Sequence, residues 1–288
     1  MAGSIALDTI EGSTGVVTDE LGGSALYFAL AASLIMPVRA VAPVGAADEQ
    51  LVRDVVEGRP IDLEFLQVLD VPTYRWRAHQ VKGRNIDLGS RDAIYDLWDP
   101  QVPQDYVGWA FVGSVRPDRQ VQLIDRLATV QLLAADSMIS YIHMREEDAR
   151  KVVSRAAWYF CNQEEFAALG GENPDDFRRS WWLQGLVIKK GSEGVDVYTE
   201  SLRLHLPALT GHKIVDTTGA GDVIAAGMLA RWLSTGAQPE GFAEALAWGV
   251  ACASITIEDV GLRAIARATR DQLEERVEEV KECMTGKS

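Results

Sequence analysis

The chain has 288 residues, of which 47% are hydrophobic and 24% are charged, a composition typical of globular proteins and too apolar for a disordered chain. Its 28 Lys and Arg against 42 Asp and Glu give a formal net charge of −14. Nucleic acids and anionic membranes are bound by basic surfaces, so this charge argues against both kinds of partner. A local pocket for a small polyanion is still allowed, because backbone N–H groups can bind phosphate without Lys or Arg.

The cysteines and the N-terminal segment indicate a cytoplasmic protein. Cys161, Cys252 and Cys283 are widely spaced and form no cluster with histidines, so we expect free thiols in a reducing compartment. Residues 1–12 show neither the basic region nor the long apolar run of a signal peptide. The longest apolar run, residues 25–38, contains a serine and a proline and is too short to span a bilayer.

The first third of the chain predicts core elements and a separate small sheet. The expected elements are a short strand at 4–7, a helix at 24–36, a strand at 38–44 and a helix beginning at 48. Residues 73–81 alternate between apolar and polar, which predicts a strand with one polar face. Such a strand belongs to an antiparallel sheet rather than to a buried parallel one. We therefore expect a single domain over residues 1–288, with a β lid formed by roughly 8–20 and 73–98.

From residue 106 onward, predicted strands and helices alternate. Strands are expected at 106–112, 132–139, 158–161 and 185–189, an antiparallel pair at 195–199 and 202–206, and helices at 119–129, 146–156, 164–169, 174–183, 219–233, 239–256 and 269–283. This alternation predicts an α/β fold with a mostly parallel sheet covered by helices on both faces. In such sheets ligands bind at the carboxyl ends of the strands, which directs attention to Asp8, Ser114, Asp136, Asn162 and Lys189.

The strongest functional signal is the string DTTGAGD at residues 216–222, which precedes a nearly uncharged helix. A glycine-rich turn that enters a helix exposes backbone N–H groups at the positive end of the helix dipole, and these bind anions. Asp222 would lie in the first turn of that helix. Because a carboxylate repels phosphate, we interpret Asp222 as a general base that takes a proton from an attacking hydroxyl. The alternative is a plain glycine turn with a dipole-stabilised aspartate, and the complete string favours the functional interpretation.

Two other nucleotide-binding motifs do not fit the sequence. No GxxxxGK[ST] string occurs, which excludes a Walker-type phosphate loop. For the dinucleotide fingerprint GxGxxG, Gly219 and Gly221 fit the first two positions, but Ile224 stands at the third.

The string at 216–222 resembles the C-terminal signature of the ribokinase-like (PfkB) carbohydrate kinase family. The resemblance covers nearly the whole chain and includes four further segments: GSIALDT at 3–9 with the later glycine pair, AVAPVGAAD at 40–48, NQEE at 162–165 and VIKKGSEGV at 187–195. It implies a three-layer α/β/α sandwich with a small β-sheet lid. It also implies an ATP-dependent kinase that transfers the γ-phosphoryl group to a hydroxyl of a small sugar or sugar-like substrate.

On the phosphate side, the resemblance makes Asp222 the catalytic base. It makes Gly219, Ala220 and Gly221 the anion hole that stabilises charge on the transferring phosphoryl group. Thr218 is implied at the cofactor-binding edge, near the position of a monovalent cation in some relatives.

The nucleotide and the metal are implied to lie along the neighbouring strand ends. Asn162 and Glu165 resemble the pair that organises Mg²⁺ through water, although Asn followed by Glu at this spacing also resembles a helix capping box. Lys189, Gly191 and Gly194 resemble the ATP-binding edge, where a solvated lysine at a strand end is the alternative for Lys189.

On the acceptor side, the resemblance implies that Asp8 hydrogen-bonds sugar hydroxyls and that Ser114 lines the same site. Gly22 and Gly23 would let the backbone approach the sugar. The structural alternative for Asp8 and the two glycines is a plain turn.

The sequence departs from the family pattern on the acceptor side. Tyr27 stands where relatives usually carry Asn, Ser114 stands where they often carry Asn, and most of the usual first strand is missing before Gly3. The alternatives are therefore a nucleoside (adenosine-like) kinase or, less favoured, a non-catalytic ligand-binding member of the fold. The exposed edge and aromatic face of the strand at 73–81 suggest a homodimer through the lid.

Overall fold

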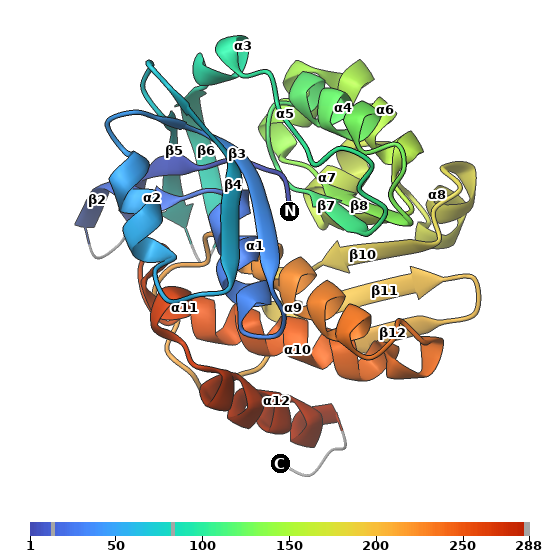
Figure 1. Ribbon diagram of the computed structural model, residues 1–288. Helices are drawn as coiled ribbons and strands as arrows, with labels where there is room; N and C mark the ends of the chain where they lie inside the picture. Colours follow the sequence, from blue (N-terminus) through green and yellow to red (C-terminus); the bar gives the residue numbers. More distant parts are fainter. Residues whose placement is uncertain (13–14, 82–83, 285–288) are drawn as a thin grey trace.

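The computed structural model describes residues 1–12, 15–81 and 84–284, and its centre is a long β-sheet (Figure 1). Six of its strands lie in the order β12-β11-β10-β9-β8-β7. Their bounds are Trp109–Val112 (β7), Leu132–Asp136 (β8), Trp158–Asn162 (β9), Gly185–Lys189 (β10), Val195–Thr199 (β11) and Arg203–Leu206 (β12). Strands β7 to β10 are parallel, whereas β11 and β12 form the predicted antiparallel edge.

The first residues of the chain join this sheet to a second parallel pair, β3 (Val38–Gly45) and β4 (Ile61–Leu69). Ala2 forms parallel bridges with both Val41 of β3 and Val112 of β7. The N-terminal residues therefore lie at the centre of the main sheet, and the chain leaves it at the carboxyl end of the parallel strands.

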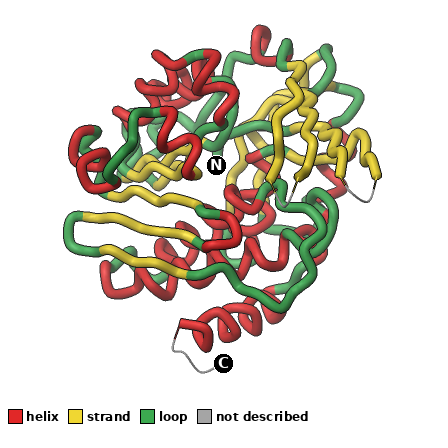
Figure 2. The backbone as a smooth tube through the Cα atoms, turned by 180° about the vertical axis from the view of Figure 1, so that it is seen from behind, coloured by secondary structure: helices red, strands yellow, loops and turns green. Residues whose placement is uncertain are grey.

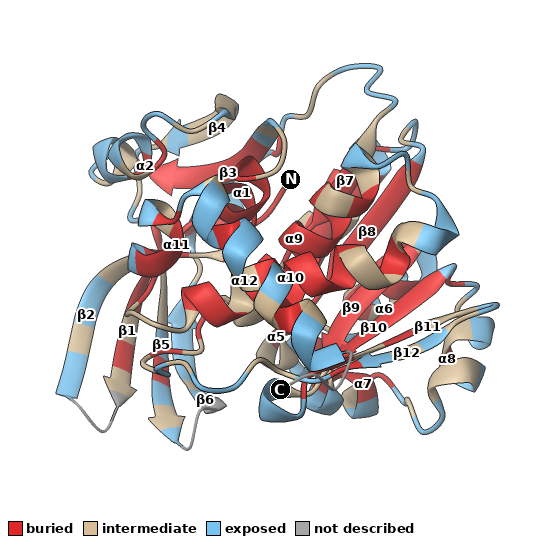
Figure 3. Ribbon diagram, turned by 90° about the horizontal axis from the view of Figure 1, so that it is seen from below, coloured by how far each residue is buried: buried red, intermediate tan, exposed pale blue. Residues whose placement is uncertain are grey.

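Helices cover both faces of this sheet, because successive strand residues point to opposite sides and both sides are apolar. In β9, Phe160 packs into one core while Tyr159 and Cys161 pack into the other. The first face carries α1 (Ser24–Ser33), α2 (Glu49–Val55), α9 (Ala220–Ser234), α10 (Phe242–Thr256), α11 (Arg263–Arg267) and α12 (Arg270–Met284). The second carries α3 (Ile94–Leu97), α4 (Pro117–Arg126), α5 (Ile139–Met144), α6 (Glu146–Arg155), α7 (Gln163–Ala168) and α8 (Pro174–Ser180). Helix α1 is the most deeply buried of these, since every one of its residues is buried, and α9 and α10 are also largely buried (Figure 3).

A separate four-stranded sheet stands beside the main sheet (Figure 2). Its order is β2-β1-β5-β6, with bounds Ala6–Gly12 (β1), Gly15–Gly22 (β2), Tyr74–Val81 (β5) and Arg84–Arg91 (β6). In β5, Tyr74 and Ala78 are buried while Arg77 and His79 are exposed, as the alternation predicts. The expected antiparallel pairing forms between β5 and β6 and between β1 and β2, but the expectation fails at the centre of the sheet, where β1 and β5 pair in parallel. Both strands enter this sheet from the same end of the main sheet, so they run in the same direction.

Several predicted boundaries differ from the structure. The strand expected at 4–7 begins at Ala6 and continues to Gly12, because it pairs along β5. The sequence analysis did not anticipate β4, an edge strand whose residues are only half-buried. The strand expected at 132–139 ends at Asp136, and a short helix follows.

Other expectations hold in detail. The capping box at the start of α12 forms, with Thr269 N–H donating to Gln272 Oε1 at 3.0 Å and Gln272 N–H donating to Thr269 Oγ1 at 3.2 Å. All three cysteines are free thiols, two of them buried and Cys283 exposed. Within the described ranges, no helix combines the length and the apolarity needed to cross a membrane.

Candidate active site

The string at 216–222 forms the N-terminus of α9. Gly219 caps this helix with φ +75°, and a Cβ at this position would lie 2.2 Å from Tyr27 Cδ1, so only glycine fits there. The preceding loop is held by the buried Asp216 carboxylate. It accepts from the N–H of Thr218 at 2.9 Å and from the N–H of Gly261 at 3.0 Å. These bonds fix the geometry of the first N–H groups of the helix.

Asp222 lies in the first turn of α9 and is half-buried. Burial raises the pKa of its carboxyl to about 6, and the ammonium of Lys189 opposes that rise. A carboxyl with this pKa is largely ionised at neutral pH yet basic enough to accept a proton.

Lys189, at the end of β10, interacts electrostatically with three carboxyl groups. Its Nζ lies 3.8 Å from Asp136 Oδ2, and a Cβ on Gly221 would lie 2.8 Å from the same Nζ. Burial alone would lower the pKa of Lys189, but the carboxyls of Asp136, Glu165 and Asp222 raise it. The lysine is therefore a largely buried cation beside the start of α9, and not the solvated strand-end lysine of the alternative interpretation.

Asn162 and Glu165 form a complete capping box at the start of α7. The N–H of Glu165 donates to Asn162 Oδ1 and the N–H of Asn162 donates to Glu165 Oε2, both at 2.8 Å. The structural interpretation of this pair is thus correct at the level of geometry. Glu165 is also buried, which raises the pKa of its carboxyl. Its charge in turn raises the pKa of Lys189.

The predicted acceptor residues gather on the other side of the α9 N-terminus. Asp8 is buried in β1, and a Cβ on Gly22 would lie 2.2 Å from its Oδ2. Gly23 has φ +97°, and a Cβ there would lie 2.4 Å from a backbone carbonyl oxygen. The backbone oxygen of Ser114 accepts from Ser24 Oγ at 2.9 Å. This bond joins the end of β7 to the start of α1.

Comparison with known proteins identifies the family to which the chain belongs. The chain matches the pfkB family of carbohydrate kinases over residues 17–269. It belongs to that family. It is similar to the cytidine kinase of Thermococcus kodakarensis, with 29% identity over 252 residues that cover 79% of this chain and 86% of the relative.

Solved structures of other kinases share the fold of this pfkB-family protein. The nucleoside kinase of Methanocaldococcus jannaschii, an archaeal member of the ribokinase family, gives a TM-score of 0.76 with 20% identity, covering 96% of this chain and 97% of that one. A fructokinase from Vibrio cholerae O395, bound to fructose, ADP and potassium ion, gives 0.79 with 17% identity and the same coverage. The expected ribokinase-like three-layer sandwich is confirmed. Membership of the family makes the chain a phosphotransferase that acts on a hydroxyl, as a carbohydrate or nucleoside kinase.

The small sheet of this pfkB-family kinase contacts both the loop that precedes α9 and helix α11. Gln80 of β5 donates to Asp216 Oδ1 at 3.3 Å, and Glu20 of β2 accepts from Arg263 of α11 at 2.6 Å. The sequence does not reveal the contact of Gln80, because nothing in the strand pattern shows which residue reaches another element.

The remaining predicted positions lie at the edges of the site. Gly194 has φ +102° in the turn between β10 and β11, and a Cβ there would lie 2.1 Å from Leu206 O, so this glycine is required by the turn. Gly191 also has a positive φ, in the short 3₁₀ turn (Gly191–Glu193) before Gly194. Asp136 is one of the strand-end residues to which the sequence directs attention, and the structure places its carboxyl beside Lys189.

Proposed function

We propose that the protein is an ATP-dependent kinase in which Asp222 is the general base and the N–H groups of residues 219–221 form the anion hole. One observation carries this proposal: a half-buried carboxyl with a pKa of about 6 stands in the first turn of a helix whose N-terminal backbone is fixed by Asp216. A plain helix-start aspartate on the surface would be stabilised as the anion and would have a lower pKa.

The proposed reaction transfers one phosphoryl group. The acceptor hydroxyl lies against Asp222, which takes its proton as the oxygen forms a bond to the γ-phosphorus of ATP. The bond from that phosphorus to the bridging oxygen breaks, and ADP leaves. The backbone N–H groups at Gly219, Ala220 and Gly221 and the ammonium of Lys189 bind the negative charge of the transferring group.

Mg²⁺ fits the residues near Lys189. Asp136 Oδ1 is a buried carboxylate oxygen without a hydrogen-bond partner in the described part of the chain. The buried Glu165 carboxyl interacts electrostatically with Lys189, as the Asp136 carboxyl does. Carboxylates that hold Mg²⁺ together with water and substrate phosphates are its usual environment. When bound, the ion would supply charge neutralisation for the phosphates, with Asp136, Glu165 and Asn162 holding it through water.

A monovalent cation is the other candidate cofactor. The Asp216 carboxylate is 3% exposed and accepts from neutral donors, including Thr218 Oγ1 at 2.7 Å and the N–H of Gly261 at 3.0 Å. A buried negative charge favours a compensating cation nearby. The expected result is higher activity in KCl than in tetramethylammonium chloride at equal ionic strength.

The acceptor is proposed to be a small sugar or sugar-like compound. A nucleoside is the second candidate, favoured by the similarity to the Thermococcus kodakarensis cytidine kinase over 79% of this chain. The deciding experiment incubates the protein with ATP and Mg²⁺ and a panel of sugars and nucleosides, and detects the phosphorylated product by mass spectrometry. Absence of product from every compound, with the folded protein binding ATP, would refute the kinase proposal and favour the non-catalytic alternative.

We further propose that the four-stranded sheet closes over the acceptor as a lid and forms a homodimer. Its outer strands carry exposed apolar residues, among them Val16 on β2 and Ile86 and Leu88 on β6. Exposed strand edges of this kind are usually paired or covered. A dimeric mass in light scattering at micromolar concentration is expected, and a monomeric mass would refute it. The three free thiols suit a reducing compartment such as the cytoplasm.

A further inference from the structure

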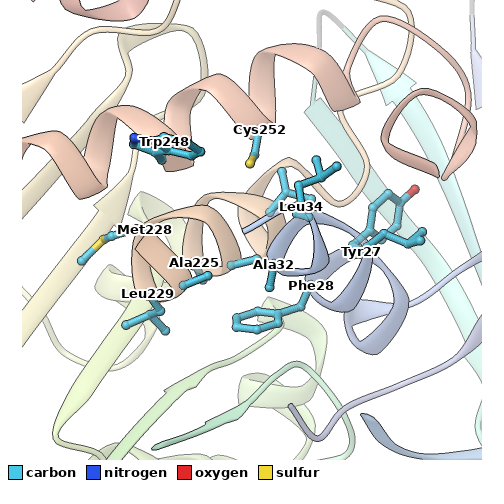
Figure 4. Close-up of a cluster of buried hydrophobic side chains, with 14 of the residues drawn as sticks. Tyr27, Phe28, Ala32, Leu34, Ala225, Met228, Leu229, Trp248 and Cys252 are labelled. Carbon is cyan, nitrogen blue, oxygen red and sulfur yellow. The ribbon is translucent and has the colours of Figure 1, made fainter. Parts of the chain in front are cut away.

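Tyr27, on α1, bridges the two halves of the candidate site. Its ring packs on Gly219 at the start of α9, where a Cβ would lie 2.2 Å from Cδ1. The other ring edge approaches the acceptor side, because a Cβ on Gly22 would lie 3.7 Å from Tyr27 Cε2 and 2.2 Å from Asp8 Oδ2. Figure 4 shows the hydroxyl pointing away from Phe28 and out of the hydrophobic cluster. The phenol therefore stands between the anion hole and Asp8.

Two buried polar atoms at this place have no hydrogen-bond partner among the described residues: the hydroxyl of Tyr27 and Oδ1 of Asp8. The indole N–H of Trp76, whose residue pairs with Asp8 across β1 and β5, is in the same situation. Leaving a buried polar group unpaired is costly, so folded proteins seldom do so without a functional reason. A ligand that carries several hydroxyls could accept from Tyr27 and Trp76 and donate to Asp8.

The charge around Tyr27 is negative. Burial raises the pKa of its hydroxyl, and the carboxyls of Asp8, Asp216, Asp222 and Glu20 raise it further. The pKa of Asp8 is likewise raised by burial and by three of its acidic neighbours. A phosphate or carboxylate of a ligand placed here would lie among these carboxyls, and those that are ionised would repel it. The buried cation of the site, Lys189, lies instead with Asp136 on the phosphate side.

We propose that Tyr27 is a specificity-determining residue: its hydroxyl donates to an oxygen of the acceptor while Asp8 accepts from an acceptor hydroxyl, and the surrounding carboxyls exclude acceptors that carry a phosphate or carboxylate. This inference rests on the proposed kinase function. It limits the acceptor to uncharged polyhydroxyl compounds, whether free sugars or nucleosides.

The first test compares matched acceptors that differ only by a phosphate: ribose with ribose 1-phosphate, and fructose with fructose 6-phosphate. Each pair keeps a free primary hydroxyl. Cytidine is added as an uncharged nucleoside. We expect kcat/KM for the uncharged acceptor to exceed that for its phosphorylated partner at least 100-fold. Equal or higher kcat/KM for the phosphorylated compound would overturn the inference while leaving the kinase function intact.

The second test is Tyr27→Phe, with Tyr106→Phe as the control. The hydroxyl of Tyr106 donates to Trp109 O at 3.1 Å, beside the amino end of β7. We expect Tyr27→Phe to raise KM for the best uncharged acceptor about tenfold, with KM for ATP changed less than twofold. The control should change neither constant. An unchanged acceptor KM in Tyr27→Phe would overturn the role of the hydroxyl.

Thermal unfolding separates this role from a structural one and needs no turnover. If the Tyr27 hydroxyl serves the acceptor, its removal should leave the Tm of the ligand-free protein unchanged or higher, because an unpaired buried hydroxyl is lost. The increase in Tm caused by the uncharged acceptor should become smaller. The inference would be overturned if the variant had a lower Tm without ligand and its Tm increased on adding acceptor as much as that of the unmodified protein. The hydroxyl would then be structural.

Discussion

The replacement Asp222→Asn tests the proposed chemistry most directly. Asparagine preserves the shape of the side chain in the first turn of α9 but cannot accept the proton of the acceptor hydroxyl. General-base catalysis contributes about 100- to 10,000-fold, or about 3–5 kcal/mol, so kcat should fall by that factor. ATP binding should be retained, because the variant removes a negative charge beside the phosphates.

The pH dependence follows from the same residue. The pKa of Asp222 is raised to about 6, and only the ionised form can act as a base. At this pKa about 97% of the carboxyl is ionised at pH 7.5 and about 9% at pH 5, so kcat/KM should fall about tenfold between these values. The loss therefore occurs as the pH falls through 6, and the profile of the asparagine variant should be flat there.

The assay follows ADP formation over a range of acceptor concentrations between pH 5 and 8.5, which gives both kcat and kcat/KM, and calorimetry measures ATP binding. Asp125→Asn is the matched control, because Asp125 is exposed on α4 and pairs with Arg155. A kcat for Asp222→Asn within tenfold of the native value would refute the assignment of Asp222 as the base. An unchanged acidic limb in that variant would assign the titration to another group.

Four further results are expected. Lys189→Met should move the acidic limb to higher pH, because losing the ammonium raises the pKa of Asp222 further; a limb at the native pH would contradict this. Asn162→Ala should lower the free energy of unfolding in urea by about 1 kcal/mol through loss of the cap. Glu165→Gln should keep the cap, since the amide oxygen can still accept, yet lower kcat at least tenfold; native turnover would leave the pair a cap only. Gly194→Ala should destabilise the protein by more than about 2 kcal/mol, because the residue has a positive φ and faces a backbone oxygen; an unchanged urea midpoint would contradict this.

Local patterns predicted the parts of the fold that depend on short-range geometry. Residues close in sequence predict three features: the alternation of the buried strands β7 to β10 with helices, the antiparallel edge of β11 and β12, and the capping box of α12. The edge strand β4 was missed because its half-buried residues show neither clean alternation nor a continuous apolar run. The parallel pairing of β1 with β5 depends on where the chain re-enters the small sheet, which no local pattern records.

The sequence by itself determined the family resemblance, the glycine turn at 216–222 and the position of Asp222 in a first helical turn, because a helix start is set by a few consecutive residues. Only the tertiary structure decided which groups surround that turn. Lys189 and Asp136 meet because β8, β9 and β10 are neighbouring parallel strands that end on the same side. Tyr27 reaches Gly219 because α1 and α9 pack on the same face of the sheet. Lys189 and burial influence the pKa of Asp222, and Tyr27 contributes to the polarity of the proposed acceptor site. Both effects depend on contacts between residues far apart in the chain, which a sequence pattern does not specify.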